Sequence, residues 1–485
     1  MSKHVEQPTS ADPALSSDGF VDAPTQPETR GIELIADADR RGRPRDLVAV
    51  WAAPSVSILN FTVGATMIVL GMQLWQAILV IVAASVLWVF PGMIAASGPR
   101  AGTSGSVIMR AMYGIIGNKI IVAFIGWLVA AVYLALNWLA AAFLGAGMLA
   151  RLGWDAPVAA PIVVALVVAS ITVLVAVYGH ALILRVYSFV AVGLVAIFLV
   201  LTGFILPQVD WGYQPAEPLQ GVALWSAITV GFTILASSPL SFINSPDMAR
   251  YLPRSSKPSH IAAATGFGGA IPMMFFTIVG ALMATAVSTD AIHSGAEQVM
   301  LGMLPTALAP LLVLGVIVNC IALNGMTTYT SSMALQAIGV PLRRIPAAII
   351  VGIIGIGLTI YLTLSTTFLD AVNLLLQFLI IVAAPVMAIF VTDQLLRRNA
   401  YEGTDLFDDT RHGRYWYTGG WGVPGLTAFV LGGTASALCL STVIWTGPIS
   451  AAIGYIDLSV PVGIIVSSVA YALLLRSPLA GKGRP

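Results

Sequence analysis

Polar side chains within long apolar stretches are the residues of this sequence that could bind another molecule. Tyr133 and Asn137 are four residues apart and share one face of a helix. Asn324 and Thr327 lie in a later apolar stretch, and Gln377 lies in a third. An aromatic ring beside an amide suits a flat heterocycle, because the ring stacks on it and the amide binds its edge. These side chains are therefore candidate substrate contacts, although hydrogen bonds between helices would explain the amides equally well.

Two further stretches, residues 54–64 and 237–247, combine helix-breaking Pro or Gly with hydroxyl and amide side chains. Interrupted helices at corresponding positions of two halves indicate a transporter site, because the broken backbone exposes carbonyls and amides. The candidate substrate contacts in these stretches are Ser57, Ser237, Ser238 and Phe242. Alternatively, both stretches are kinks whose serines bond to their own helix, and the second helix could also end at Ser237.

Carboxylates are scarce in the apolar stretches. Asp247, Asp370 and Asp393 all fall near the expected ends of helices, where solvated or loop-capping charges are common. Asp247 and Asp393 are nevertheless the nearest candidates for a proton carrier, because a partly buried carboxylate can take up a proton near neutral pH.

No catalytic or metal-binding pattern accompanies these residues. The sequence shows no hydrolase triad, Walker loop or metal motif, and its 5 histidines are scattered without ligand spacing. Cys320 and Cys439 both lie in apolar stretches and imply no disulfide framework. We therefore expect neither an enzyme nor a cofactor or metal site.

The composition places these residues in a membrane protein. Of 485 residues, 58% are hydrophobic and only 9% are charged, whereas soluble domains average roughly 25% charged residues. A soluble globule of this composition would have too few charges to cover its surface, so lipid is the natural solvent. The formal net charge of +1 gives no reason to expect nucleic acid as a partner.

Apolar stretches long enough to span about 30 Å of hydrocarbon follow one another along most of the chain. They must be helices, because a lipid-exposed backbone has to satisfy its own hydrogen bonds. The sequence therefore predicts an all-α membrane protein with about twelve transmembrane helices. The predicted helices are 49–72, 74–97, 119–149, 157–178, 186–207, 221–244, 259–288, 306–338, 346–363, 367–393, 421–446 and 455–476.

The positive residues test the order of these helices, because Lys and Arg concentrate in cytoplasmic loops. With a cytoplasmic N-terminus, only Arg151 of the 23 Lys and Arg residues falls outside the cytoplasmic segments. The external loops instead carry Asp210, Glu217, Asp290 and Glu297. A missed helix would scramble this alternation, so we expect twelve spans in the cytoplasmic membrane, with both termini cytoplasmic.

Four segments follow from this map. Residues 1–46 are rich in Pro, Ser, Asp and Arg, and we expect them to be a disordered cytoplasmic tail. Residues 47–393 hold the first ten helices, and residues 394–420 form a cytoplasmic loop. Residues 421–485 hold helices 11 and 12 and a short cytoplasmic tail.

Short segments of the chain look like parts of one known family. Residues 98–103 (Gly-Pro-Arg-Ala-Gly-Thr) and 110–114 (Arg-Ala-Met-Tyr-Gly) are similar to its loop after helix 2. Residues 245–253 (Ser-Pro-Asp-Met-Ala-Arg-Tyr-Leu-Pro) resemble its exit from helix 6, and residues 329–339 (Tyr-Thr-Ser-Ser-Met-Ala-Leu-Gln-Ala-Ile-Gly) the end of its helix 8. On these matches the chain resembles the nucleobase–cation symporter-1 family, in its purine–cytosine permease branch.

The resemblance implies a five-plus-five inverted repeat, in which helices 1–5 and 6–10 are related and helices 11 and 12 are appended. It implies one substrate at the membrane midplane, between helices 1, 3, 6, 8 and 10. The family's aromatic residue and amide of helix 3 fall on Tyr133 and Asn137, although the usual aromatic is Trp. Sodium-coupled members carry hydroxyls just before the Asn of helix 8. This chain has Ala322 and Leu323 before Asn324, which favours proton coupling.

The expected function is therefore secondary active transport. The chain would import a nucleobase such as cytosine or a purine together with a proton, by alternating access. The alternatives are a sodium-coupled transporter of hydantoin, allantoin or a ring-shaped vitamin, and a membrane receptor that does not transport. Apart from the heterocycle and the ion, the expected partner is membrane lipid.

Overall fold

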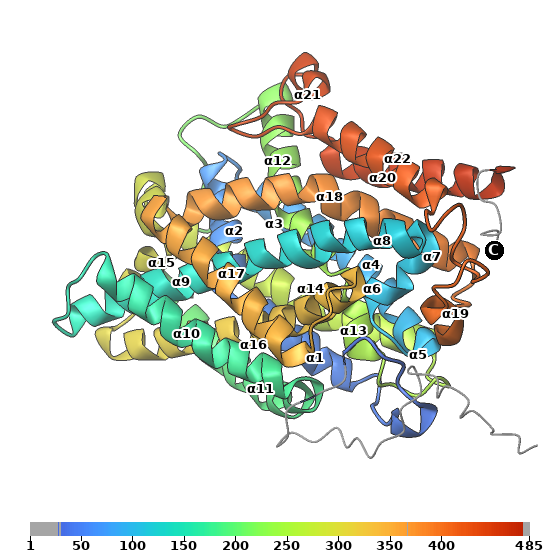
Figure 1. Ribbon diagram of the computed structural model, residues 1–485. Coiled ribbons are helices and arrows are strands. Elements are labelled where there is room, and N and C mark those ends of the chain that lie inside the picture. Colours follow the sequence, from blue (N-terminus) through green and yellow to red (C-terminus); the bar gives the residue numbers. More distant parts are fainter. Residues whose placement is uncertain (1–27, 29–30, 366, 479–485) are drawn as a thin grey trace, which may run out of the picture.

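Membrane-length helices dominate the structure of this chain (Figure 1). The computed structural model describes residues 28, 31–365 and 367–478. Within these residues, ten helices are long and apolar enough to cross a membrane, and the bent pair of α1 (Asp46–Ser55) and α2 (Ile58–Val69) makes an eleventh span. α20 (Val423–Cys439) is apolar but shorter, at 17 residues, and occupies the place of one further predicted helix. The prediction of an all-α membrane protein is confirmed.

The other spans are single helices or runs of consecutive helices. Those of the first half are α3 (Leu74–Ser85), η3 (Val86–Trp88), α4 (Val89–Ala95) and α5 (Ser97–Ala101), then α8 (Ile115–Val122), η4 (Ala123–Val129) and α9 (Ala130–Arg151), then α10 (Ala159–Tyr178) and α11 (His180–Ile205). Those of the second half are α12 (Gly221–Ser241) with α13 (Ser245–Ala249), α14 (Pro258–Ala284), α16 (Ala309–Ile338), α17 (Arg344–Ser365), α18 (Phe368–Leu396) and α22 (Ser459–Arg476). The connections contain α6 (Gly105–Ile108), α7 (Arg110–Tyr113), α15 (Thr289–Met303), α19 (Gly403–Phe407) and α21 (Pro448–Ala452).

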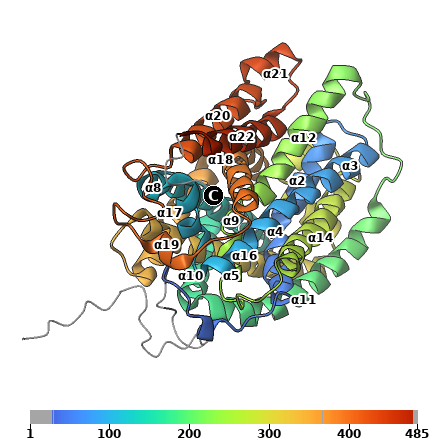
Figure 2. The same cartoon turned by 90° about the vertical axis from the view of Figure 1, so that its right-hand side faces the viewer.

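Eight spans form two groups of helices. In the first group, α9, α10, α16 and α17 pack against one another. In the second group, α14 packs against α1, α2, α3 and α4, and α12 packs against α3. Each group takes two spans from each half of the chain, as expected when two related halves interlock. Figures 1 and 2 show α20 and α22 together at one edge, where they pack against α18, which in turn contacts α12.

Glycines let α2 and α14 approach closely within the second group. A Cβ atom on Gly64 would lie 1.9 Å from the carbonyl oxygen of Thr277, and one on Gly280 would lie 2.1 Å from that of Phe61. Neither position has room for a side chain, so the two helices meet backbone to backbone, as small residues permit in membrane proteins. This crossing fixes the second part of the broken first span.

The first span is interrupted at Val56 and Ser57. Pro54 lies in the last turn of α1, and the backbone leaves helical geometry at Val56, with φ −81° and ψ 78°. The Ser57 hydroxyl then begins α2 by accepting a hydrogen bond from the Leu59 amide at 3.2 Å. The break that the sequence predicts in residues 54–64 is therefore present.

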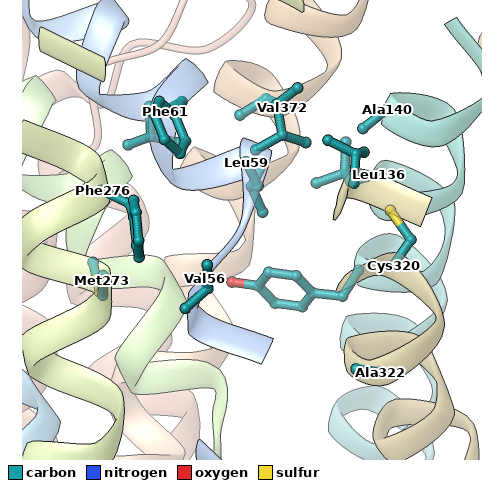
Figure 3. Close-up of a cluster of buried hydrophobic side chains, with 14 of the residues drawn as sticks. Val56, Leu59, Phe61, Leu136, Ala140, Met273, Phe276, Cys320, Ala322 and Val372 are labelled. Carbon is teal, nitrogen blue, oxygen red and sulfur yellow. The ribbon is translucent and has the colours of Figure 1, made fainter. Parts of the chain in front are cut away.

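Apolar side chains from both groups surround this break. Figure 3 shows Val56 and Leu59 between Phe276 of α14 on one side and Leu136 of α9 and Cys320 of α16 on the other. All five side chains are buried. The interruption of the first span thus lies in the core between the two groups.

Segments predicted to be cytoplasmic come together at one end of the molecule. Arg40 donates to the carbonyl oxygen of Pro99 at 2.6 Å, which joins the N-terminal segment to the end of α5. Arg110 donates to the carbonyl oxygen of Leu406 at 3.0 Å, which joins α7 to α19. The loops that the charge pattern assigns to the cytoplasm therefore lie on one side of the bundle.

The end of the predicted N-terminal tail is packed against these loops. Most of the range 1–46 lies outside the described residues. Within them, Ile35 is buried and its amide donates to the carbonyl oxygen of Gly102 at 2.9 Å. The prediction of disorder therefore extends too far for residues 31–46, because composition does not reveal a contact with a distant loop.

The connection between α14 and α16 contains a helix that the hydropathy pattern does not predict. α15 begins after Ser288, whose hydroxyl accepts a hydrogen bond from the Ala291 amide at 3.3 Å. Ile292 and Leu301 on this helix are buried in the core. Its mixed polar and apolar sequence does not read as a span, so hydropathy alone misses it.

Candidate functional site

A cavity lies beside the break of the first span, between the two groups of helices. The first group contributes residues of η4, α9 and α16, and the second group contributes residues of α1, α2, α12 and α14. The wall also includes residues 242–244, where the backbone leaves α12 before α13 begins. Both interruptions that the sequence predicts therefore meet at one cavity. η4 is a π-helix, a wider turn that occurs frequently at functional sites.

Three aromatic rings stand at this cavity. The ring of Phe242 stacks on that of Trp88 with centroids 5.1 Å apart. The ring of Tyr133 is nearly parallel to that of Phe242, at 19°, with centroids 6.5 Å apart. Because carbon atoms pack at about 3.5–4.0 Å, one flat ring held between two others needs about 7 Å. The centroids of Tyr133 and Phe242 are slightly closer than this, so the two rings would have to move apart by about 0.5 Å or more to admit a flat ligand between them.

Hydroxyl and amide groups line the wall next to these rings. The Tyr133 hydroxyl lies near the hydroxyls of Ser237, Ser238 and Ser241 of α12, of which Ser238 and Ser241 line the cavity. Asn60 of α2 and Thr327 of α16 also reach the cavity, and none of the described residues that line it is acidic or basic. A charged ligand would lack an opposite charge here, and burial of an unpaired charge is costly. The wall therefore suits a neutral molecule with a flat ring and polar edges.

Several residues predicted as substrate contacts are brought together here. Tyr133, Ser57, Ser238, Phe242 and Thr327 all line the cavity, although they come from four separate stretches of sequence. The Thr327 hydroxyl donates to the carbonyl oxygen of its own helix four residues earlier, at 2.9 Å, so its oxygen can still accept a hydrogen bond. Direct contact of these side chains with a substrate stays a prediction.

The amides of Asn137 and Asn324 bind to each other rather than line the cavity. Asn137 Nδ2 donates to Asn324 Oδ1 at 3.2 Å and to the carbonyl oxygen of Tyr133 at 2.7 Å. Asn324 Nδ2 donates to the carbonyl oxygen of Leu134 at 2.9 Å. Both side chains are buried, and neither is part of the cavity wall. In this arrangement they hold α9 and α16 together behind Tyr133, and the substrate contact that the sequence pattern suggests for either stays untested.

Ser237 and Gln377 are also buried away from the cavity wall. The Ser237 hydroxyl donates to the carbonyl oxygen of Ile234 at 2.7 Å, which is the bond to its own helix that the alternative interpretation describes. Gln377 lies within α18, and its neighbour on the same face, Asn373, accepts a hydrogen bond from Thr66 of α2 at 3.2 Å. The predicted roles of Ser237 and Gln377 stay untested.

Asp247 binds the loop after the second span. Its Oδ1 atom accepts a hydrogen bond from the backbone amide of Gly105 at 2.7 Å, and its side chain is fully buried. Its Oδ2 atom has no hydrogen-bond partner within the described part of the chain. A protonated carboxyl would have a hydrogen to donate from this atom, so Asp247 stays a candidate proton carrier.

Asp393 is held in a buried cluster at the end of α18. It accepts hydrogen bonds from Arg397 Nε at 2.7 Å, from the Tyr471 hydroxyl at 2.6 Å and from the Tyr401 hydroxyl at 2.8 Å. Burial and the neighbouring Asp393 raise the pKa of Tyr401 well above its ordinary value, so this phenol remains a donor. Both oxygens of Asp393 therefore already accept hydrogen bonds, whereas Oδ2 of Asp247 accepts none from the described residues, which makes Asp393 the weaker candidate for a proton carrier.

Sequence reasoning missed polar residues of the cavity wall. Asn60 lies in the interrupted stretch 54–64 and lines the cavity. An amide within one or two turns of a helix-breaking proline was a signal that could have identified it. Asn244 Nδ2 donates to the Thr330 hydroxyl at 2.8 Å, and both residues line the cavity. Nothing in the sequence pairs these last two positions, because Asn244 lies between α12 and α13 whereas Thr330 lies in α16.

The fold and the motifs have counterparts in known proteins. A family model described as permease for cytosine/purines, uracil, thiamine, allantoin matches residues 34–463. The chain is 24% identical over 464 residues to the putative purine-cytosine permease YxlA of Bacillus subtilis, covering 93% of this chain and 96% of that protein. It is 22% identical over 457 residues to the purine-cytosine permease FCY2 of Saccharomyces cerevisiae, covering 88% of this chain and 81% of that protein.

A solved structure shares the fold. Mhp1, a nucleobase-cation-symport-1 family transporter in a closed conformation with bromovinylhydantoin bound, aligns with a TM-score of 0.73 at 18% identity. The alignment covers 94% of this chain and 98% of that one. The expected transporter fold with its interlocked halves is confirmed, and so is the family resemblance seen in the loop and helix-end motifs. The chain belongs to the family of permeases for cytosine/purines, uracil, thiamine and allantoin.

Proposed function

We propose that this chain is a secondary active transporter that imports a nucleobase, such as cytosine or a purine, together with a proton. It would lie in the cytoplasmic membrane with both termini in the cytoplasm. The observation that carries this proposal is the uncharged cavity at the helix break, in which the ring of Tyr133 stands nearly parallel to that of Phe242.

Nucleobases match the chemistry of this wall. They are flat and neutral, and their edges carry hydrogen-bond donors and acceptors. Stacking of a base on an aromatic side chain contributes about 1–3 kcal/mol, and Tyr133 and Phe242 offer two such faces. Ser238, Ser241 and Asn60 offer the polar groups that a base edge would need. The names of the relatives in Bacillus subtilis and Saccharomyces cerevisiae support the same choice of substrate.

The position of the cavity supports transport by alternating access. In transporters with related halves, one group of helices rocks against the other around a central site. Tyr133 of α9 and Thr327 of α16 belong to the first group, whereas Ser57 and Phe242 adjoin helices of the second. Relative movement of the groups would therefore change the access to this cavity from either side of the membrane, while the same residues continued to line it.

The proton would be carried by a carboxylate outside the cavity wall. Asp247 is the preferred carrier, because one of its carboxylate oxygens has no partner within the described residues. Asp393 already binds Arg397 and two phenols. Movement of the loop that contains Gly105 would change the surroundings of Asp247, which would couple protonation to access.

Uptake by the purified protein in liposomes tests this function. Radiolabelled cytosine, adenine, hypoxanthine, uracil, allantoin and hydantoin would be compared under an inward proton gradient, an inward sodium gradient, or neither. We expect accumulation of at least one nucleobase that needs the proton gradient and is indifferent to sodium. Accumulation of only hydantoin or allantoin, driven by sodium, would overturn the proposed substrate and the proposed ion together.

A further inference from the structure

The end of α1 exposes the kind of backbone atoms that can bind a cation. The last four carbonyl groups of a helix have no partner within it. In transporters, the carbonyls of a broken helix coordinate the coupling ion, and this negative end of a half-helix favours positive charge. In this chain the four carbonyls are those of Ala52, Ala53, Pro54 and Ser55, beside the cavity.

Each of these four carbonyls accepts a hydrogen bond from an uncharged donor of the chain. The backbone amide of Val56 donates to Ala52 at 3.1 Å. Asn60 Nδ2 donates to Ser55 at 2.6 Å. The other two carbonyls share one donor, Asn319 Nδ2 of α16, which lies 2.9 Å from the oxygen of Ala53 and 3.4 Å from that of Pro54.

Asn319 connects the two groups of helices at this point. Its side chain is fully buried, and it reaches from α16 of the first group to α1 of the second. The two residues three and four positions further along the same face of α16 are Ala322 and Leu323, which have no side-chain oxygen. The carbonyl oxygen of Ala322 itself accepts a hydrogen bond from the Tyr187 hydroxyl.

The orientation of the Asn319 amide is set by its neighbours. With Nδ2 on the two carbonyls, Oδ1 has no hydrogen-bond partner within the described residues. Turning the amide over would place Oδ1 against the oxygens of Ala53 and Pro54, which would repel it unless a cation lay between them. Either an N–H donor or a cation can therefore satisfy these carbonyl oxygens. A chain that places a donor there does not need a sodium ion at this position.

We propose that Asn319 stands in for a coupling cation. Its amide nitrogen supplies the partial positive charge that the broken end of α1 needs, and it ties α1 to α16 as a bound sodium ion would. Because this tie is part of the chain, the interruption can hold its shape and substrate can bind without sodium. Asn319 is thus an ion-specificity residue. The role of Asn319 in ion coupling rests on the proposed transport function, whereas its replacement of a cation at the end of α1 does not.

Replacing the donor by an oxygen tests this role. Asn319→Asp places a carboxylate against two carbonyl oxygens and should convert the position into a cation site. Asn118→Asp is the matched control, because Asn118 is equally buried and its Nδ2 atom also donates to a backbone carbonyl, that of Ser106, on another helix. Melting temperatures of the purified full-length proteins would be measured in sodium chloride and in choline chloride of equal concentration.

The native protein should melt at the same temperature in both salts. Asn319→Asp should be stabilised by sodium in a concentration-dependent way, as expected for an ion that binds only the folded state, whereas Asn118→Asp should not. Where a nucleobase binds, its affinity for Asn319→Asp should be at least about tenfold higher in sodium than in choline, and its affinity for the native protein should not differ.

Sodium stabilisation of the native protein that Asn319→Ala abolishes would overturn the inference, since Asn319 would then be a cation ligand. Equal sodium responses of the two Asp variants would also overturn it. The melting measurement needs no substrate, so a response confined to Asn319→Asp would uphold this inference even if no nucleobase were transported.

Discussion

The carboxylate of Glu28 lies 3.6 Å from the guanidinium of Arg250, with both side chains buried. The other oxygen of the same carboxylate lies 3.7 Å from Arg344, and the Tyr251 hydroxyl donates to the first at 2.8 Å. Arg250 follows α13 directly, and Arg344 begins α17. One residue of the N-terminal segment therefore joins a helix end from each of the two groups.

Loss of this buried carboxylate should destabilise the protein. Glu28→Ala leaves two buried arginines without their anion, and breaking a buried ion pair costs about 3–5 kcal/mol. The melting temperature of the purified protein should fall clearly. Asp37→Asn is the control, because it removes an exposed partner of Arg40 at 3.1 Å, and such pairs contribute about 0–1 kcal/mol. Equal effects of the two substitutions would contradict the buried network.

The stacked rings should determine substrate affinity. Phe242→Ala should weaken nucleobase binding roughly tenfold to a hundredfold, because one stacking face contributes about 1–3 kcal/mol. Tyr133→Phe keeps the ring and should bind more tightly than Tyr133→Ala. Phe124→Ala is the control, since Phe124 is 49% exposed and lies outside the cavity wall. Normal equilibrium binding of nucleobase by Phe242→Ala would show that this ring does not contact the substrate.

The amide pair behind Tyr133 should contribute mainly to stability. Asn137→Ala leaves Asn324 Oδ1 without its donor, and a buried polar group left unpaired costs about 1–3 kcal/mol. We expect a lower melting temperature and, well below it, nearly native substrate affinity. Thermal unfolding and binding measured on the same preparation check this. Weakened binding at an unchanged melting temperature would instead show direct contact of Asn137 with substrate.

The charge pattern predicts which side of the membrane each loop faces. Cysteines placed at Glu217 and at Asp409, both exposed loop positions, should react with a membrane-impermeant maleimide from opposite sides. Glu217→Cys should label in intact cells, and Asp409→Cys only after permeabilisation. The native Cys320 and Cys439 are buried, so the unmodified protein is the background control. Labelling of both positions in intact cells would refute the predicted orientation.

The order of the spans follows from the sequence because lipid imposes a simple rule. A backbone in hydrocarbon must be helical, and each crossing needs a long apolar stretch. The same rule makes interruptions visible, since Pro54 and Ser57 stand out in an apolar helix. Ser57, Phe242 and Tyr133 could each be identified as candidate substrate contacts from the local sequence pattern, and all three line one cavity.

The tertiary structure alone decides what each buried amide binds. Asn137, Asn319 and Asn324 have the same chemistry and similar apolar neighbours in sequence. Asn324 faces α9, where Asn137 meets it, whereas Asn319 faces the broken end of α1. The sequence shows that each amide must turn away from lipid, and their spacing of five puts Asn319 and Asn324 on different faces. Which neighbour each face meets depends on how the helices cross. The pairing of Glu28 with Arg250 depends likewise on a chain segment that returns to distant helix ends, and no local pattern encodes it.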